Sequence, residues 1–203
     1  LVNAGQHEIA RQACCALANL AEEVENQPRI VQKDAIDRLT RALSSKSHNV
    51  QREAARCLGN LAANCEYGAS MFKKGVCAPL NLLLRMDDIG CQRMAAMALA
   101  NIATNVKIQQ RMLKMDILEP MVTLAKKGLD PKAKSDSETE RYVLLCLANL
   151  AVTPENHKNM IDAHALDLIV GFSKARDVKC RQFFLGISEF LKCIGLHWFC
   201  IGL

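Results

Sequence analysis

The chain has 203 residues, of which half are apolar but only 4% are aromatic. Such a composition is typical of tightly packed helices and argues against a β-sandwich, which would be richer in Val, Thr and aromatic residues. The 26 basic and 21 acidic residues give a net charge of +5, a mild excess that permits an acidic partner but does not by itself indicate nucleic-acid binding.

One short segment recurs four times, at residues 11–21, 52–62, 93–103 and 141–151. In each copy an Arg stands eight residues before an Asn, and the asparagines are Asn19, Asn60, Asn101 and Asn149, spaced by 41, 41 and 48 residues. A fixed period in this range predicts a stack of repeated units. The chain length then corresponds to about five units, the first and the last incomplete.

In chain order, residues 1–25 form a partial unit that contributes one helix, predicted at 7–21. Residues 26–65 are a complete unit with three helices: a short one broken near Asp34, a second at 35–43 and a third at 49–64. Residues 66–105 repeat this layout with a shift of 41, so that Gly75 matches Asp34. We expect Gly75 to adopt the left-handed conformation that ends a helix.

Residues 106–153 form a further unit, which carries a loop insertion at 128–137. The insertion lengthens the loop by seven residues and accounts for the spacing of 48. It is either a tolerated flexible loop, the interpretation we favour, or an element near a partner. A last, partial unit covers 154–182, and His164 stands there at the inter-helix position of Asp34, which predicts a helix end.

Residues 183–203 form an atypical hydrophobic segment with no Asn at the repeat position. Three interpretations remain open: a divergent capping helix, a membrane segment, or sequence foreign to the repeat. Glu189, Lys192 and His197 make a membrane span costly, at about 2–3 kcal/mol for each charge near its centre. A terminal repeat should also present a polar outer face, so we favour the foreign or truncated alternative.

The ten cysteines form no CxxC pair and no His/Cys cluster with metal-ligand spacing. Cys57 and Cys146 stand where other units have Ala16 and Ala98, which indicates small buried apolar residues. We therefore predict buried free thiols and a reducing compartment. No metal and no cofactor are expected.

The recurring third helix has two faces. Positions six, three and two before the Asn and one and two after it are apolar in all four copies, which predicts the buried stripe. Positions eight and four before the Asn, and the Asn itself, lie on another face because four residues make about one turn. That face carries the candidate binding residues Asn19, Asn60, Asn101, Asn149, Arg11, Arg52, Arg56, Arg93, Arg141 and Met97.

Stacking the units predicts a row of Asn amides beside a row of Arg guanidinium groups. An Asn amide can donate and accept, so such a row can hold an extended peptide by its backbone; alternatively, each Asn bonds within the solenoid. The arginines stand near helix starts, where the helix dipole does not favour a cation. Either they bridge to carbonyls or acids of an adjacent unit or they attract an acidic partner. The position four before the Asn varies, and partner selectivity is expected there.

The three-helix unit, the period near 41 and the ending Ala-Leu-x-Asn-Leu-Ala resemble the armadillo repeat, over residues 7–181. The resemblance implies an all-α, right-handed α-solenoid (superhelix) and a peptide-binding role for the four asparagines. The Arg-rich start of the third helix is closer to β-catenin, plakoglobin and the fungal vacuolar armadillo protein than to importin-α. Importin-α repeats carry Trp four residues before the Asn, where this chain has Cys15, Arg56, Met97 and Leu145.

These features predict a protein-binding scaffold or adaptor that holds an extended, acidic segment of a partner along the third-helix groove. Alternatives are a nuclear transport receptor of the importin-α type and the substrate-recruiting part of a longer protein such as a ubiquitin ligase. No phosphate loop or nucleophile motif is present, so we do not expect an enzyme. Nor do we expect a small-molecule substrate, nucleic-acid binding or direct membrane contact. The expected location is the cytoplasm, with the nucleus or a membrane periphery (through a partner or a missing N-terminal region) as alternatives.

Overall fold

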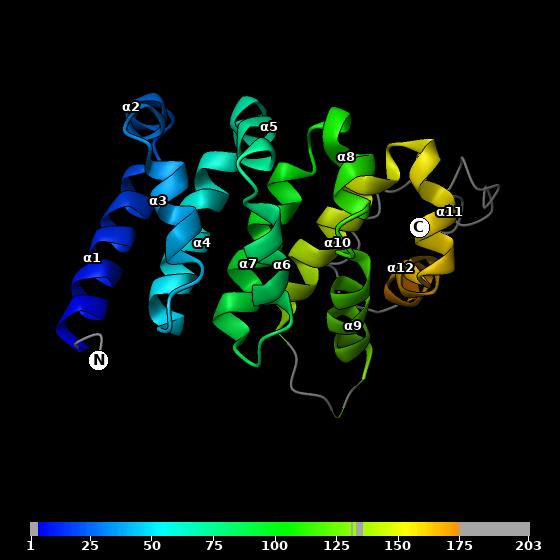
Figure 1. Cartoon of the computed structure of the whole chain (residues 1–203). Helices are drawn as coiled ribbons and strands as arrows, with labels where there is room; N and C mark the ends of the chain where they lie inside the picture. Colours follow the sequence, from blue (N-terminus) through cyan, green and yellow to red (C-terminus); the bar gives the residue numbers. More distant parts are fainter. Residues whose placement is uncertain (1–3, 131, 133–135, 175–203) are drawn as a thin grey trace.

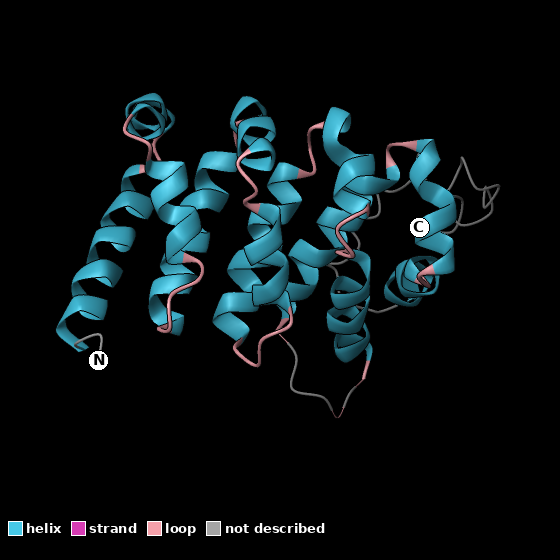
Figure 2. Cartoon of the chain, viewed as in Figure 1, coloured by secondary structure: helices cyan, strands magenta, loops and turns pink. Residues whose placement is uncertain are grey.

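The computed structural model describes residues 4–130, 132 and 136–174. Helices joined by short loops make up this part of the chain, which contains no strand (Figure 2). The all-helical prediction is therefore confirmed for the described residues. The hydrophobic segment 183–203, for which three interpretations were left open, lies outside them.

The helices can be grouped in the order of the predicted units. The first, partial unit contributes α1 (Ala4–Leu20). Each later unit begins with a short first helix, and these are α2 (Gln27–Gln32), α5 (Cys65–Lys73), α8 (Val106–Leu113) and α11 (His157–Asp162). A 3-10 turn precedes two of them, η1 (Val24–Asn26) before α2 and η2 (Pro154–Asn156) before α11. The second helices are α3 (Ala35–Ala42), α6 (Cys77–Leu84), α9 (Leu118–Leu129) and α12 (Ala165–Lys174). The later third helices are α4 (His48–Ala62), α7 (Ile89–Ile102) and α10 (Ser137–Ala151).

The units follow one another across the molecule from α1 to α12, which makes an open, elongated stack (Figure 1). The third helices form one row, in which α1 packs on α4, α4 on α7 and α7 on α10. The second helices α3, α6 and α9 each pack on the third helix of their own unit. The stack therefore leaves one side of every third helix for a role other than the core.

The buried stripe lies where the repeat pattern predicts it. In α4 all five positions are fully buried, namely Ala54, Cys57, Leu58, Leu61 and Ala62. In α1 the corresponding stripe is mostly open, and Leu20 is 51% exposed although its α4 counterpart Leu61 is 0% exposed. The difference arises because the described structure contains no first and second helices of the unit to which α1 belongs.

The junction between first and second helices has the same conformation in every complete or partial unit that contains it. Gly75 has φ 75°, as predicted, and Asp34, Asp116 and His164 at the matching positions have φ of 55°, 51° and 61°. A left-handed backbone costs a non-Gly residue roughly 1–2 kcal/mol. The helix-end prediction for His164 is also confirmed, and the shared turn keeps the second helices in register along the stack.

The insertion is only partly a loop, which corrects the predicted range 128–137. Helix α9 continues through Gly128 to Leu129, and α10 begins at Ser137. A Cβ built on Gly171 in α12 would lie 2.9 Å from Leu129 Cδ1, so Leu129 packs against the next unit. Helix α9 thus runs about one turn further than α6.

Candidate functional site

Three of the four asparagines in the predicted row donate an amide N–H within the solenoid. Asn60 Nδ2 donates to Ala18 O, Asn101 Nδ2 to Gly59 O and Asn149 Nδ2 to Ala100 O, each at 2.9 Å. Every acceptor is the carbonyl of the residue that precedes the Asn of the previous unit. These bonds join consecutive third helices. They agree with the alternative in which each Asn bonds within the solenoid.

This bond uses only part of each side chain. The Asn amide has a second N–H and an acceptor oxygen, and the Oδ1 atoms of Asn60, Asn101 and Asn149 have no hydrogen-bond partner among the described residues. All three side chains are half-buried. The same residue can therefore join two units and still present an acceptor to a bound chain.

Arg56 makes Asn19 different. Its Nη2 atom donates to Asn19 Oδ1 at 2.7 Å and lies 3.4 Å from Cys15 O. Its Nη1 and Nε atoms donate to Glu22 and Glu53, both at 3.0 Å. All three nitrogens of this guanidinium are engaged, so Arg56 and Asn19 form a closed polar network across α1 and α4.

Arg93 bridges two units. Its Nε and Nη2 atoms donate to the two carboxylate oxygens of Asp136 at 2.9 and 2.6 Å, a bidentate pair. Asp136 is also the N-cap of α10, where it accepts from the Thr139 N–H at 2.9 Å. Burial opposes ionisation of Asp136, but the hydrogen bonds from Arg93 and Thr139 outweigh it and hold its pKa below the ordinary value. For Arg93, bridging to an acid of the adjacent unit is the alternative that the structure supports.

The remaining arginines have acids close by in their own helices. Arg11 pairs with Glu8 at 2.6 Å and Arg141 with Glu138 at 2.8 Å, both at i,i+3 spacing. Arg52 is the least engaged, with its Nε 3.6 Å from Glu53. The guanidinium of Arg141 also lies 4.2 Å from the ring centroid of Tyr142.

These acids, which the predicted site omitted, are part of the same face. Each could have been found in the sequence, since Glu8, Glu53 and Glu138 stand three residues before an Arg on the same helix. The Arg row is consequently accompanied by carboxylates along its length.

The position four before the Asn changes character along the row. It is Cys15 in α1 and Arg56 in α4, but Met97 in α7 and Leu145 in α10. The terminal methyl of Met97 occupies the space that a Cβ on Gly59 would need, so Met97 lies against the α4 backbone beside Asn60. Leu145 is a partly buried apolar residue at the edge of the core. At this position the face is therefore polar at its α1–α4 end, with Cys15 and Arg56, and apolar at its α7–α10 end, with Met97 and Leu145.

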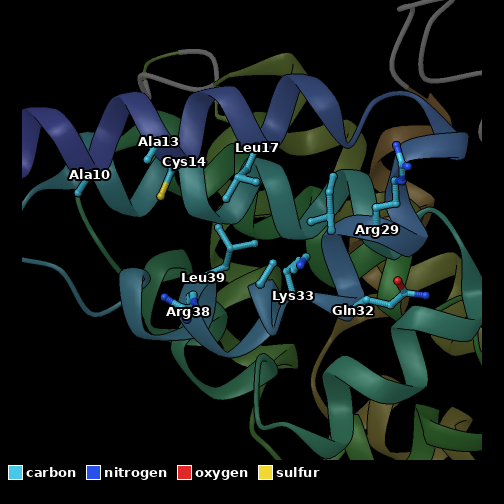
Figure 3. A pocket seen from close by; sticks show the side chains of 11 residues that line it. Ala10, Ala13, Cys14, Leu17, Arg29, Gln32, Lys33, Arg38 and Leu39 are labelled. Carbon is cyan, nitrogen blue, oxygen red and sulfur yellow. The ribbon is translucent and has the colours of Figure 1, made fainter.

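A hollow of about 850 Å³ opens at the uncovered side of α1 (Figure 3). Its apolar lining includes Ala10, Ala13, Leu17 and Leu39, with Arg38 at its edge. This hollow lies beside the open stripe of α1 and is distinct from the Asn row.

Five of the seven cysteines in the described residues are buried and all seven are free. The prediction of buried thiols is wrong for Cys65, which is exposed, and for Cys15, which is half-buried. Burial raises the pKa of Cys57 and Cys77 to about 12, which keeps those thiols protonated. Among the described helices, none combines the length and the apolar character that crossing a membrane requires.

Comparisons with known proteins agree with this architecture. A model of the HEAT-like repeat matches residues 7–61. An engineered protein of known structure is 31% identical, over 91% of this chain and 75% of its own length, with a TM-score of 0.81. No curated protein sequence matches the chain.

Two further solved structures are designed armadillo repeat proteins. One, in complex with the peptide (KR)4, is 23% identical over 90% of this chain and 75% of its own, with a TM-score of 0.80. The other, designed for modular peptide recognition, is 24% identical over 89% and 74%, with a TM-score of 0.79. The chain has the fold of the armadillo/HEAT-like class of repeat solenoids. Within that class its fold is that of the armadillo-repeat solenoids.

Proposed function

We propose that the chain is a protein-binding scaffold or adaptor that holds an extended, acidic segment of a partner along the third-helix groove. The observation that carries the proposal is the row of half-buried asparagines whose Oδ1 atoms have no partner among the described residues. Such acceptors suit the N–H groups of an extended backbone. The peptide recognition described for the designed armadillo proteins supports the same use of the fold.

The arginines support an acidic partner, with Arg52 as the strongest contributor because it is the least engaged. We further propose that the chain lies closer to the β-catenin and plakoglobin branch than to importin-α, since no third helix carries Trp before its Asn. On this proposal the chain acts in the cytoplasm and is not an enzyme.

The acidic half of the proposal is tested with synthetic acidic peptides and an Arg52→Glu variant. We expect the affinity to fall about tenfold or more and its salt dependence to weaken, because an attraction becomes a repulsion. Arg38→Glu is the matched control, since this exposed residue on α3 undergoes the same charge change away from the Asn row. Equal affinities for wild type and Arg52→Glu would contradict an electrostatic role.

A receptor for basic segments is the second candidate, because Glu53 and Glu138 lie on third helices and Glu22 lies in the turn after α1. Titration with a Lys/Arg repeat peptide separates the two. Tighter binding of the basic peptide than of the acidic one would favour the transport-receptor alternative.

A further inference from the structure

The Oδ1 atom of Asn19 is already occupied by a hydrogen bond from the next unit. The donor is Arg56, which stands four residues before Asn60 on α4. The residue at this position of one unit therefore lies against the Asn of the unit before it. This relation connects the variable position of the repeat with the constant one.

In the next two units the corresponding side chains have no N–H to donate. Met97 stands in the place of Arg56 relative to Asn60, and Leu145 stands there relative to Asn101. The position of Met97 against Gly59, the neighbour of Asn60, agrees with this register. Both Asn60 and Asn101 accordingly retain an Oδ1 atom without a partner among the described residues.

We infer that the groove is open only from Asn60 onward and that its ligand carries apolar side chains, a specificity that rests on the proposed function. Backbone N–H groups of the ligand bond to Asn60 and Asn101, and apolar side chains lie against Met97 and Leu145. Packed helices are about 8–10 Å apart and an extended chain rises about 3.3 Å per residue. The two apolar residues of the ligand are therefore two to three positions apart.

The acidic character of the ligand then belongs to the residues that flank this apolar pair. Arg56 is excluded as a ligand contact because its nitrogens bond to Asn19, Glu22 and Glu53. Arg52 has no such set of partners and remains available.

The test is selection of a displayed library of random peptides of about twelve residues, long enough when extended to cross three helix steps. We expect the full chain to select apolar residues at two positions with the spacing given above. The Met94→Glu/Met97→Arg variant copies the Glu53–Arg56 pair into α7. It should bind the selected peptide about tenfold more weakly and lose one of the two apolar preferences.

Arg56→Met is the matched variant, since it removes the side chain that occupies Asn19 and should bind at least as tightly as wild type. Circular dichroism establishes that each variant is folded. A folded Met94→Glu/Met97→Arg variant with unchanged affinity and preference would overturn the inference and leave the proposed function intact. A loss of affinity in Arg56→Met would also overturn it. Failure of the wild type to select any peptide would overturn the proposed function, and the inference with it.

Discussion

The two ends of the third-helix face are built on copies of the same repeated helix but are held by different interactions. At the α1–α4 end Arg56 gathers Glu22, Glu53 and Asn19 into one polar network. At the α7–α10 end the matching residues are Met97 and Leu145, which bring no donor to the preceding Asn.

The difference shows that stacking and recognition are separable in this solenoid. The inter-unit bond from Asn Nδ2 to the preceding carbonyl has the same length, 2.9 Å, beside Arg56, Met97 and Leu145 alike. The side chain four residues before the Asn can therefore change without altering how the units stack. What changes is the chemistry offered to a partner.

The largest expected effect comes from a pair of core variants, which tests whether α1 is buried as deeply as the later third helices. Leu58 is fully buried in α4, whereas Leu17, at the same repeat position in α1, is half-buried. We expect Leu58→Ala to lower the free energy of unfolding by about 2–5 kcal/mol, because it leaves a cavity. Leu17→Ala should cost about 1 kcal/mol or less, because solvent already reaches that site. Urea denaturation followed by circular dichroism measures both.

Equal losses for the two leucine variants would mean that α1 is covered in solution. The pair thus tests the asymmetry between α1 and the later third helices directly, with the same chemical change at the same repeat position.

The next prediction concerns the bridge at the α7–α10 end. Asp136→Asn should lower the free energy of unfolding by about 1–3 kcal/mol near neutral pH, because the Arg93 pair and the charged N-cap are both weakened. The folded-state pKa of Asp136 is lowered. Its contribution is therefore present above the unfolded pKa, about 3.9, and is lost as the pH falls through the folded value.

Urea denaturation of wild type and Asp136→Asn at pH 7 and at pH 3 measures this contribution. The difference between the two proteins should shrink at the lower pH. A difference that is independent of pH would show that the carboxylate charge is not the cause.

Much of this architecture could be predicted from the sequence, because residues in equivalent positions recur at a fixed spacing in several units. The shift that aligns Asp34, Gly75 and His164 predicted a helix end at each of them and a left-handed backbone at Gly75, and the structure adds that Asp34 and His164 have a left-handed backbone as well. The bridge from Arg93 to Asp136 was not predictable in the same way. Asp136 lies at the end of the insertion, where the period no longer gives the register, and its partner is 43 residues away.

The Asn row illustrates a different limit. The sequence offered peptide binding and internal bonding as alternatives, whereas the structure shows that one amide serves the stack through Nδ2 and leaves Oδ1 over. The repeat pattern identifies the Asn, but it does not show that Nδ2 bonds to the neighbouring unit while Oδ1 remains an acceptor. The extra turn of α9 was also missed, and its last residue, Leu129, lies beside Gly171 of the next unit.

At the α1–α4 end, Arg56→Met should lower the free energy of unfolding by about 0.5–1 kcal/mol. The effect is modest because Glu22 is 60% exposed, so water screens and replaces part of the network. A double-mutant cycle with Glu53→Gln isolates the coupling between these two side chains. A coupling energy near zero would show that the network positions Arg56 without stabilising the fold, and the two ends would then differ in recognition alone.

The smallest expected change in stability is at Gly59, the residue against which Met97 lies. Replacing a mid-helix Gly by Ala adds roughly 1 kcal/mol of helix stability. The new methyl group displaces the end of Met97, a flexible side chain, and reaches only ordinary contact with the Ala98 backbone at 3.5 Å. The two effects oppose each other, so Gly59→Ala should change the free energy of unfolding by less than about 1 kcal/mol in either direction. A loss above about 2 kcal/mol would mean that the close approach of α4 and α7 tolerates no side chain at this position. Gly59 would then be needed for the packing of the two helices and not only for the space that Met97 occupies.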